Sequence, residues 1–496
     1  MFEKVTPESV GLSSRQIRKY INKLEENGLA THAMIILRHD KICYEKYWEP
    51  FTSKDLHRMY SQSKSIVSIA VGFAVQDGLM SLDDPIIKYF PKEVTQNASP
   101  YVKIQTIRNM LMMSTGFPER TDLWFTRKPK DRVKDYFDAS VEFMEEAMIP
   151  GTIFTYDSDG SFVLCAAVER VTGKYLMDYL REKLFDYIGV SEEAYCLQCP
   201  GGYSWGDSGI MCTPMDMLKI ALFVMNHGQW NGKQILNEQY MREATSNLIS
   251  TDRTGTVVPE KNGYGYQIWK LKGNCFLFSG MGCQYALGIP DKDILFIYNG
   301  DNQGNPIAAT TIIDCFFDLV VNEVNSDCID VNAYEYEKLI EYSNNLILHH
   351  CIGQAEHKLM KQINNKEYQL TPNTMGIKSL KFVFDGQKGA IEYVNQQGYK
   401  KIVFGMGYNE FGLFPQEGYS NDVGSEKTIG YYYRCACSAE WQTGNILHIS
   451  VQIIDKYFGR LDIFIAFKDE NAFSIRMCNS AEDFLSEYTG QAVGMC

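Results

Sequence analysis

The alternation of apolar and polar positions divides the chain into two parts of different texture. Near the N-terminus, apolar residues recur at helical spacing from Ser13 to Glu26, and Gly28 follows soon after. A serine at the start and a glycine just past the end are typical of a helix. Two apolar, aromatic-rich runs, Ala33 to Arg38 and Ile42 to Trp48, then flank a short polar turn. This pattern predicts a helix followed by a β-hairpin.

The next part of the chain, to about residue 245, is predicted to be mostly helical, and strand-like runs return after it. These runs are residues 264–271, 275–278, 285–289 and 294–298, and a helix from 308 to about 324 follows them. Strands at both ends of one unit, with helices between and around them, pack most simply as one antiparallel sheet with helices on either face. The predicted fold class is therefore α+β, in a first domain that spans residues 1–327.

The texture changes after a helical stretch from 334 to about 362. From Tyr368 onward, seven or eight short alternating runs are separated by turn signals such as Asp385-Gly386. Short strands at hairpin spacing predict a small closed β-barrel, and a short helix, residues 481–488, is expected to end the chain. We therefore expect a helical linker at 328–364 and a β-barrel domain at 365–496.

Composition and charge exclude several classes of partner. The chain has 496 residues, 45% of them hydrophobic and 22% charged, which is ordinary for a globular protein with a sizeable core. Its net charge of −13 argues against nucleic acid or an anionic membrane as the main partner. No apolar stretch approaches the length that crosses a bilayer, and the first residues lack the basic and apolar regions of a secretory leader. A cytoplasmic protein without a membrane partner is expected.

The 14 cysteines are scattered along the chain, as expected of reduced thiols. Cys196-x-x-Cys199 has the spacing of half a zinc site or of a redox pair. No second Cys-x-x-Cys pair follows at ligand spacing, so structural thiols are favoured. No metal and no cofactor are expected.

The candidate chemistry begins at Ser61, which stands three residues before Lys64 at the start of a long apolar segment. Residues three apart share a helix face, so the two side chains can touch. Free N–H groups at a helix N-terminus favour a developing oxyanion, and a lysine in an apolar setting can take the serine proton. The pattern is typical of a Ser-Lys acyl-transfer enzyme, although a chance Ser-x-x-Lys match stays open on spacing alone.

Two further segments carry candidate site residues. Tyr156 and Ser158 lie at a predicted loop-to-helix junction, where side chains are readily presented to a cleft. Ser279 and Gly280 end one predicted strand, just before the next, and place a hydroxyl and N–H groups beside the sheet edge. In isolation, Tyr156 is better explained as a packed aromatic residue, and Ser279-Gly280 is also consistent with a glycine-rich hairpin connection.

Taken in order, Ser61-x-x-Lys64, Tyr156-x-Ser158 and Ser279-Gly280 resemble the serine β-lactamase and penicillin-binding-protein superfamily. The resemblance is closer to its class C-like branch of esterases, D-aminopeptidases and 6-aminohexanoate-dimer hydrolases, and it spans residues 5 to about 325. It implies a two-step acyl transfer in which Ser61 attacks a carbonyl and Lys64 and Tyr156 move the protons.

The same resemblance implies the supporting residues. The N–H groups of Ser61 and Met281 would hold the oxyanion, Ser158 would take the place of the usual asparagine, and Ser279 that of the usual threonine. Phe278 stands where the family has a lysine or histidine that helps to hold a substrate carboxylate. Its presence points away from β-lactams and towards an ester, a small amide or a less anionic substrate.

Several alternatives stay open beside the serine hydrolase. A D-amino-acid peptidase or an acyltransferase would use the same site, and a catalytically silent protein could bind a ligand in its barrel. A lipocalin-like barrel after this domain resembles the arrangement in D-aminopeptidases of the superfamily, where such a barrel can reach the active site. Packing or subunit contact is the favoured role of the barrel. The expected partner is a small ester, amide or peptide substrate, and a homo-oligomer is left open.

Two other motifs in the chain are incomplete. Gly206-Asp207-Ser208-Gly209 echoes a trypsin-like nucleophile motif but lacks the histidine context and the all-strand pattern of such proteases. Asp157-x-Asp159-Gly160 resembles the start of a calcium loop but lacks its remaining ligands. Neither is expected to form the site that its motif suggests.

Overall fold

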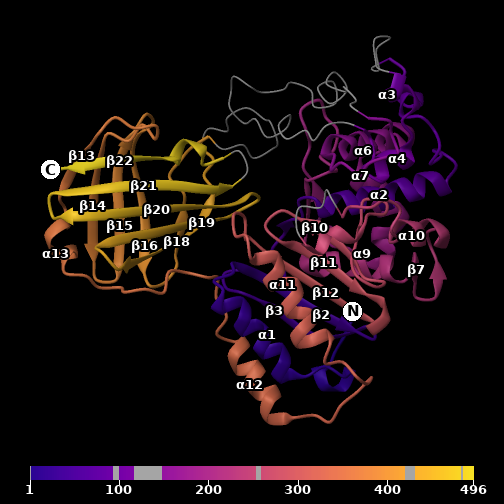
Figure 1. The fold of residues 1–496 in the computed structure, drawn as a ribbon, viewed down its shortest axis with the longest axis horizontal. Helices are drawn as coiled ribbons and strands as arrows, with labels where there is room; N and C mark the ends of the chain where they lie inside the picture. The colour runs from indigo at the N-terminus through magenta and orange to yellow at the C-terminus, as the bar shows by residue number, and fades with distance from the viewer. Residues whose placement is uncertain (1, 93–99, 117–147, 253–257, 419–429, 482–483) are drawn as a thin grey trace. The chain divides into compact units, whose positions relative to one another are not determined.

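The computed structural model describes residues 2–92, 100–116, 148–252, 258–418, 430–481 and 484–496. The described chain forms two compact units, of which the first ends at Ile347 and the second begins at Leu348 (Figure 1). This division falls inside the expected linker 328–364. Among the described helices, none is long and apolar enough to cross a membrane.

The first unit is built on a seven-stranded sheet to which both ends of the unit contribute. Across the sheet, the strands are β1 (Glu3–Lys4), β3 (Lys41–Tyr47), β2 (Thr31–Arg38), β12 (Ile294–Gly300), β11 (Gln284–Ile289), β10 (Phe276–Gly280) and β9 (Trp269–Lys270). The hairpin strand β2 pairs antiparallel with β12, far along the chain. This confirms the predicted sheet, except that the short β1 pairs parallel with β3.

Helices cover both faces of this sheet (Figure 1). Alternate strand residues such as Met34, Ile36 and Phe296 share a core with α1 (Ser14–Glu26) and α11 (Ala308–Phe316). From the other side, α9 (Pro214–Met225) contacts β2, β11 and β12. The expected α+β arrangement is therefore confirmed.

The described part of the region between the strands is rich in helices, as predicted. The α-helices described there are α2 (Gln62–Gln76), α3 (Pro100–Ile104), α4 (Ile107–Leu111), α6 (Ser158–Thr172), α7 (Leu176–Leu180), α8 (Asp186–Ile188), α9 and α10 (Glu238–Ala244). A small sheet joins β4 (His57–Arg58), β6 (Ile210–Cys212) and β5 (Tyr195–Cys196), and β4 leads into α2.

The predicted strand at 264–271 is mostly wrong. Only Trp269–Lys270 forms a strand, because the chain reverses at Gln267, whose φ is +57°. Tyr264 and Trp269 then face each other across an isolated bridge. The Gln267 amide donates to the Met110 carbonyl oxygen at 2.8 Å, which fixes this turn against α4.

The helical stretch expected at 334–362 is also only partly present. It contains α12 (Ala333–Ser343) and α13 (Leu359–Ile363), with non-helical chain between them. Leu339 of α12 belongs to the core of the first unit, and Ser343 hydrogen-bonds Tyr44 of β3 at 2.8 Å. Most of the expected linker helix is therefore part of the first unit.

The second unit is a β-barrel. Its strands are β13 (Glu367–Leu370), β14 (Ser379–Asp385), β15 (Lys388–Asn395), β16 (Gly398–Met406), β17 (Glu410–Leu413), β18 (Arg434–Gln442), β19 (Ile446–Ile454), β20 (Phe458–Asp469), β21 (Ala472–Ala481) and β22 (Gly490–Met495). Nine of these described strands close into a ring through the pairing of β16 with β18, and β17 is added beside β18. The predicted barrel is confirmed, with more strands than the sequence indicated.

The helix expected at the end of the barrel is wrong. In the described part of this range, which leaves out 482 and 483, the structure has the 3-10 turn η8 (Ser486–Tyr488), followed by β22, which pairs with β21 and with β13. The strand was not predicted because Gly490 and Gly494 interrupt its pattern of apolar residues. Both glycines are needed, because a Cβ on Gly490 would lie 2.3 Å from Thr374 Oγ1 and a Cβ on Gly494 would lie 2.3 Å from Phe473 Cζ.

Candidate active site

The structure brings Ser61 and Lys64 together at the N-terminus of α2. Ser61 is the N-cap residue of this helix, and the Lys64 ammonium nitrogen lies 2.9 Å from its hydroxyl oxygen. Tyr60 has a φ of +47°, an unusual conformation for a bulky residue, in the turn from β4 to α2. Such strain is often held at functional sites, and here it directly precedes Ser61 in the chain.

Lys64 is fixed from a second side by the loop after β5. Its side chain is about 2% exposed, and Nζ donates to the main-chain oxygen of Asp207 at 2.8 Å. The Asp207 carboxylate lies 3.9 Å from the same nitrogen. These contacts hold the amine in one position beside the Ser61 hydroxyl.

Asp207 was not predicted from the sequence, because its tetrapeptide resembles a protease motif that the rest of the chain does not support. Burial raises the pKa of its carboxyl to about 6, although the nearby Lys64 and Arg58 favour the ionised form. Arg58 lies between the rings of Tyr60 and Trp205, 4.2 Å from each centroid. Lys64, Arg58 and Asp207 therefore form a buried polar group next to the candidate nucleophile.

The raised pKa of Asp207 predicts a pH dependence of stability. The folded protein binds this proton more tightly than the unfolded chain does, so stability is lost as pH rises from about 4 to about 7. The loss is about 2–3 kcal/mol. Asparagine does not titrate, so Asp207→Asn should not show this pH-dependent loss, and the wild type should become less stable relative to the variant as the pH rises. The unfolding midpoints of both proteins are measured at pH 4.5 and 7.5. A difference between the two midpoints that is the same at both pH values would contradict the prediction.

Tyr156 is the third candidate that the structure places here. The Lys64 ammonium lies 5.2 Å from the centroid of the Tyr156 ring. The ring stacks on Trp269 of β9, with centroids 6.0 Å apart and planes within 8°. Trp269 follows the turn at Gln267 that interrupts the predicted strand. This turn therefore places the ring against which Tyr156, the candidate proton carrier, is stacked.

Ser158 is the first residue of α6 and so lies at the expected loop-to-helix junction. Asp157 is the N-cap, and its carboxylate accepts a hydrogen bond from the Gly160 N–H at 2.9 Å. The Asp157-x-Asp159-Gly160 motif is thus a helix cap. Ser158 is partly exposed, and its role in the site stays a prediction.

The strand β10 carries the remaining candidates close to α2. A Cβ on Gly280 would lie 2.3 Å from the main-chain oxygen of Met59, so only glycine fits this approach. The Gln62 amide donates to the Phe278 carbonyl oxygen at 3.4 Å and joins the same two elements. Ser279 lies between these two contacts along the strand, and Met281 directly follows them. Both therefore lie at the strand end that approaches the Ser61 turn, and their roles in the site stay predictions.

Two residues beside Ser279 set the charge of this edge. Phe278 is fully buried and provides no cation. Ser279 Oγ donates to the carboxylate of Glu260 at 3.2 Å, in the 3-10 turn η5 (Val258–Asn262). Glu260 was not predicted from the sequence, because no spacing connects it with the strand motif.

Comparisons with known proteins show the family of the chain and the fold. The family model described as Beta-lactamase matches residues 17–311. The chain is 24% identical over 276 residues to the 6-aminohexanoate-dimer hydrolase of Paenarthrobacter ureafaciens, covering 52% of this chain and 69% of that protein.

Two solved structures show the fold. The octameric penicillin-binding protein homologue from Pyrococcus abyssi has a TM-score of 0.50 at 15% identity, over 96% of this chain and 99% of its own. The Beta-lactamase/D-alanine carboxypeptidase from Yersinia pestis has a TM-score of 0.50 at 16% identity, over 63% of this chain and 98% of its own. The match to the Pyrococcus abyssi protein extends over the barrel unit as well. The match to the Yersinia pestis protein covers a fraction of the chain close to that of the first unit alone.

Proposed function

The chain belongs to the Beta-lactamase family, and from this premise we propose that it hydrolyses a small ester or amide through an acyl-enzyme on Ser61. The observation that carries the proposal is the buried Lys64 amine, 2.9 Å from the Ser61 hydroxyl oxygen. A serine needs such a neighbour to take its proton before it can attack a carbonyl.

The contacts of Lys64 suit that step. Lys64 Nζ lies within hydrogen-bond distance of both the Ser61 hydroxyl oxygen and the Asp207 main-chain oxygen. In the proposed step the amine enters without its extra proton, so that its lone pair can accept the Ser61 hydrogen. The Ser61 proton moves to Nζ while Oγ bonds to the carbonyl carbon. The resulting oxyanion is held by the N–H groups of Ser61 and Met281, and each such donor contributes about 10²–10³ in rate.

The second half of the reaction returns the site to its starting state. The proton passes by way of Tyr156, whose ring faces the Lys64 nitrogen, to the departing alcohol or amine. Water then attacks the acyl carbonyl, gives a proton to the same pair, and releases Ser61 with its proton restored. In an acyltransferase, an alcohol or amine would take the place of water in this last step. In a D-amino-acid peptidase, the steps would be the same and the acyl group on Ser61 would come from a peptide.

The charge of the β10 edge supports a substrate without a carboxylate at that position. The fully buried Phe278 replaces the expected cation, and the acid Glu260 hydrogen-bonds the neighbouring Ser279. A substrate carboxylate at this end of β10 would be repelled by the Glu260 carboxylate and would find no cation at position 278. Neutral esters, small amides and substrates with an amino group are favoured over penicillins.

Labelling of the nucleophile tests the proposal. The protein is incubated with a fluorophosphonate, and its intact mass is recorded before and after. One adduct is expected in the wild type and none in Ser61→Ala. Ser68→Ala is the matched control, because Ser68 is buried in the same helix but contacts Tyr240 instead of Lys64, and it should label like the wild type. An adduct that survives in Ser61→Ala, or none in the wild type, would refute the proposal.

Substrate charge provides a separate prediction. In Glu260→Gln, kcat/KM for p-nitrophenyl hemisuccinate is expected to rise about five- to tenfold relative to p-nitrophenyl butyrate, because a like charge is removed. Glu238→Gln is the control, since it removes an acid that pairs with Arg242 on α10. An unchanged ratio of the two esters in Glu260→Gln would show that Glu260 does not set the charge preference.

A further inference from the structure

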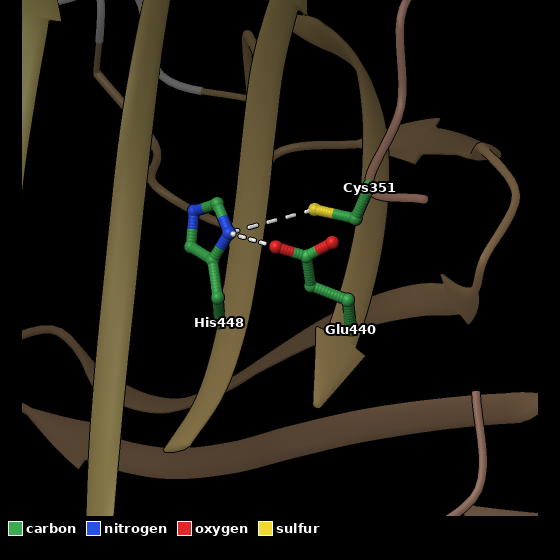
Figure 2. Close-up of side chains that lie close together, drawn as sticks. All are labelled: Cys351, Glu440 and His448. Carbon is green, nitrogen blue, oxygen red and sulfur yellow. Dashed lines mark hydrogen bonds and ion pairs between the residues drawn. The ribbon is translucent and has the colours of Figure 1, made fainter. Parts of the chain in front are cut away.

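A second group of reactive side chains lies in the barrel unit, independent of the Ser61 site. Cys351, Glu440 and His448 have a sulfur, a carboxylate oxygen and an imidazole nitrogen within 4.8 Å of one another. Figure 2 shows the three side chains converging, with Glu440 and His448 on neighbouring strands and Cys351 on the segment that passes over them. Glu440 belongs to β18 and His448 to β19.

The segment that carries Cys351 is held firmly on these strands. The His349 main-chain oxygen accepts from Gln452 at 2.7 Å, and the Cys351 N–H donates to Ser438 Oγ at 3.0 Å. Two residues further, the Gly353 N–H donates to Glu440 Oε2 at 2.6 Å. Main-chain contacts of the protein itself therefore hold the thiol close to His448.

The nitrogen–oxygen separation in this group is long for a hydrogen bond, and the nitrogen–sulfur separation is that of a weak contact to sulfur. His448 Nδ1 lies 3.7 Å from Cys351 Sγ and 3.3 Å from Glu440 Oε1, whereas charge-assisted bonds to a carboxylate are usually about 2.7–2.9 Å long. A single hydrogen on Nδ1 also cannot point well at two acceptors. The three groups surround a point without closing on one another.

The same separations fit a tetrahedral metal ion. Bonds of about 2.3 Å to sulfur and about 2.0–2.1 Å to nitrogen and oxygen put sulfur and nitrogen about 3.6 Å apart, and nitrogen and oxygen about 3.4 Å apart. The observed values of 3.7 and 3.3 Å agree with both. Thiolate, imidazole and carboxylate together form a ligand set suited to Zn²⁺.

The surroundings of His448 support this use of Nδ1. Its other nitrogen, Nε2, lies 2.9 Å from Asp462 Oδ1, and Asp462 in turn accepts from Arg460 at 2.7 Å. A carboxylate on the far nitrogen of a histidine keeps the hydrogen there and turns the near nitrogen's lone pair towards a metal. The ring is also stacked on Phe464 at 4.5 Å, which fixes its plane.

We propose that Cys351, Glu440 and His448 bind one Zn²⁺ ion, which fastens the segment Leu348–Gln354 to strands β18 and β19. Binding replaces the thiol proton and any proton on Nδ1, which are released to solvent, and forms three metal–ligand bonds with a fourth position for water. The competing occupant is a proton on His448. Burial alone would lower the pKa of this imidazole, but Asp462 and Cys351 outweigh it and raise the pKa to about 10.

Metal titration of the full-length protein, reduced and freed of metal with a chelator, tests the proposal. One equivalent of Zn²⁺ is expected to bind with a Kd of about 1 μM or tighter. Co²⁺ is expected to give the near-ultraviolet thiolate charge-transfer band and the intense visible bands of a tetrahedral site. Cys351→Ser should remove the charge-transfer band and weaken Zn²⁺ binding at least about tenfold, and His448→Ala and Glu440→Gln should weaken it by a similar factor.

The matched control is Cys478→Ser. This cysteine lies on β21 with its sulfur 3.9 Å from the Asp462 main-chain oxygen, so its variant should keep the full cobalt spectrum. As a check on folding, Zn²⁺ should raise the melting temperature of the wild type but not that of Cys351→Ser. A charge-transfer band that persists in Cys351→Ser, a band lost only in Cys199→Ser, or no Zn²⁺ binding at micromolar concentration would each overturn the site and leave His448 as a protonated structural residue.

Discussion

Replacement of Lys64 by methionine is expected to lower kcat by about 10³–10⁴ while the fold is retained. Lys64 Nζ is the group in contact with the Ser61 hydroxyl, at 2.9 Å, and general-base assistance accounts for about 10²–10⁴ in rate. Because Lys64 also passes the proton on to the leaving group, we expect a loss of kcat at the upper end of this range. Methionine fills a similar volume in this buried position, so packing is largely kept. The measurement is kcat on a neutral p-nitrophenyl ester, with the circular dichroism spectrum as a check on folding.

Two controls separate proton transfer from charge. Lys64→Arg keeps a cation near Asp207 but cannot accept a proton, so it should be about as inactive as Lys64→Met. Lys88→Met removes an exposed lysine that pairs with Asp84 at 2.8 Å and should leave kcat unchanged. If Lys64→Met kept kcat within tenfold of the wild type, Lys64 would not be the base, and the proposed chemistry would lose its main support.

The sequence predicted the local part of the site better than its surroundings. Ser61 and Lys64 are three residues apart on one helix, so their contact follows from helix geometry alone. The approach of β10 to the Ser61 turn depends on long-range packing, and the Ser279-Gly280 pair indicated it only through the resemblance. Asp207 had only a misleading protease-like motif and Glu260 had no signal, because each lies in a segment whose course depends on the fold.

The same difference between local and long-range information explains where the fold was predicted wrongly from the sequence. The hairpin β2–β3 and the helix α1 follow from periodicity and turn residues, and both are present. The reversal at Gln267 puts a non-glycine residue at positive φ, stabilised by Ser65, Ser161 and Met110 from elsewhere in the chain. Turn residues could not reveal it. The Cys351 group was invisible for a related reason, since its three ligands lack the close spacing by which metal motifs are recognised.

Replacement of Gly280 by alanine is expected to lower kcat/KM by about 100-fold or more, although residue 280 has no functional group of its own. The added Cβ would lie 2.3 Å from the Met59 main-chain oxygen, far inside the range of ordinary contacts. Met59 cannot easily yield, because its N–H is bonded to the Ile210 carbonyl oxygen at 2.9 Å and the next residue, Tyr60, holds a positive φ. Strand β10 must therefore move away from Ser61 and take the N–H of Met281 with it. A displacement of about 1 Å typically costs about 10² in rate.

The variant also separates the oxyanion site from the nucleophile. The Ser61–Lys64 contact lies within α2 and does not involve β10, so Gly280→Ala should still accept a fluorophosphonate on Ser61, but more slowly, in step with its loss of ester hydrolysis. Gly412→Ala is the matched control, since a Cβ on this glycine of β17 meets no atom within 4 Å, and both rates should equal those of the wild type. Full activity in Gly280→Ala would mean that the β10 edge does not hold the oxyanion, and the second donor would have to be sought on another element beside Ser61.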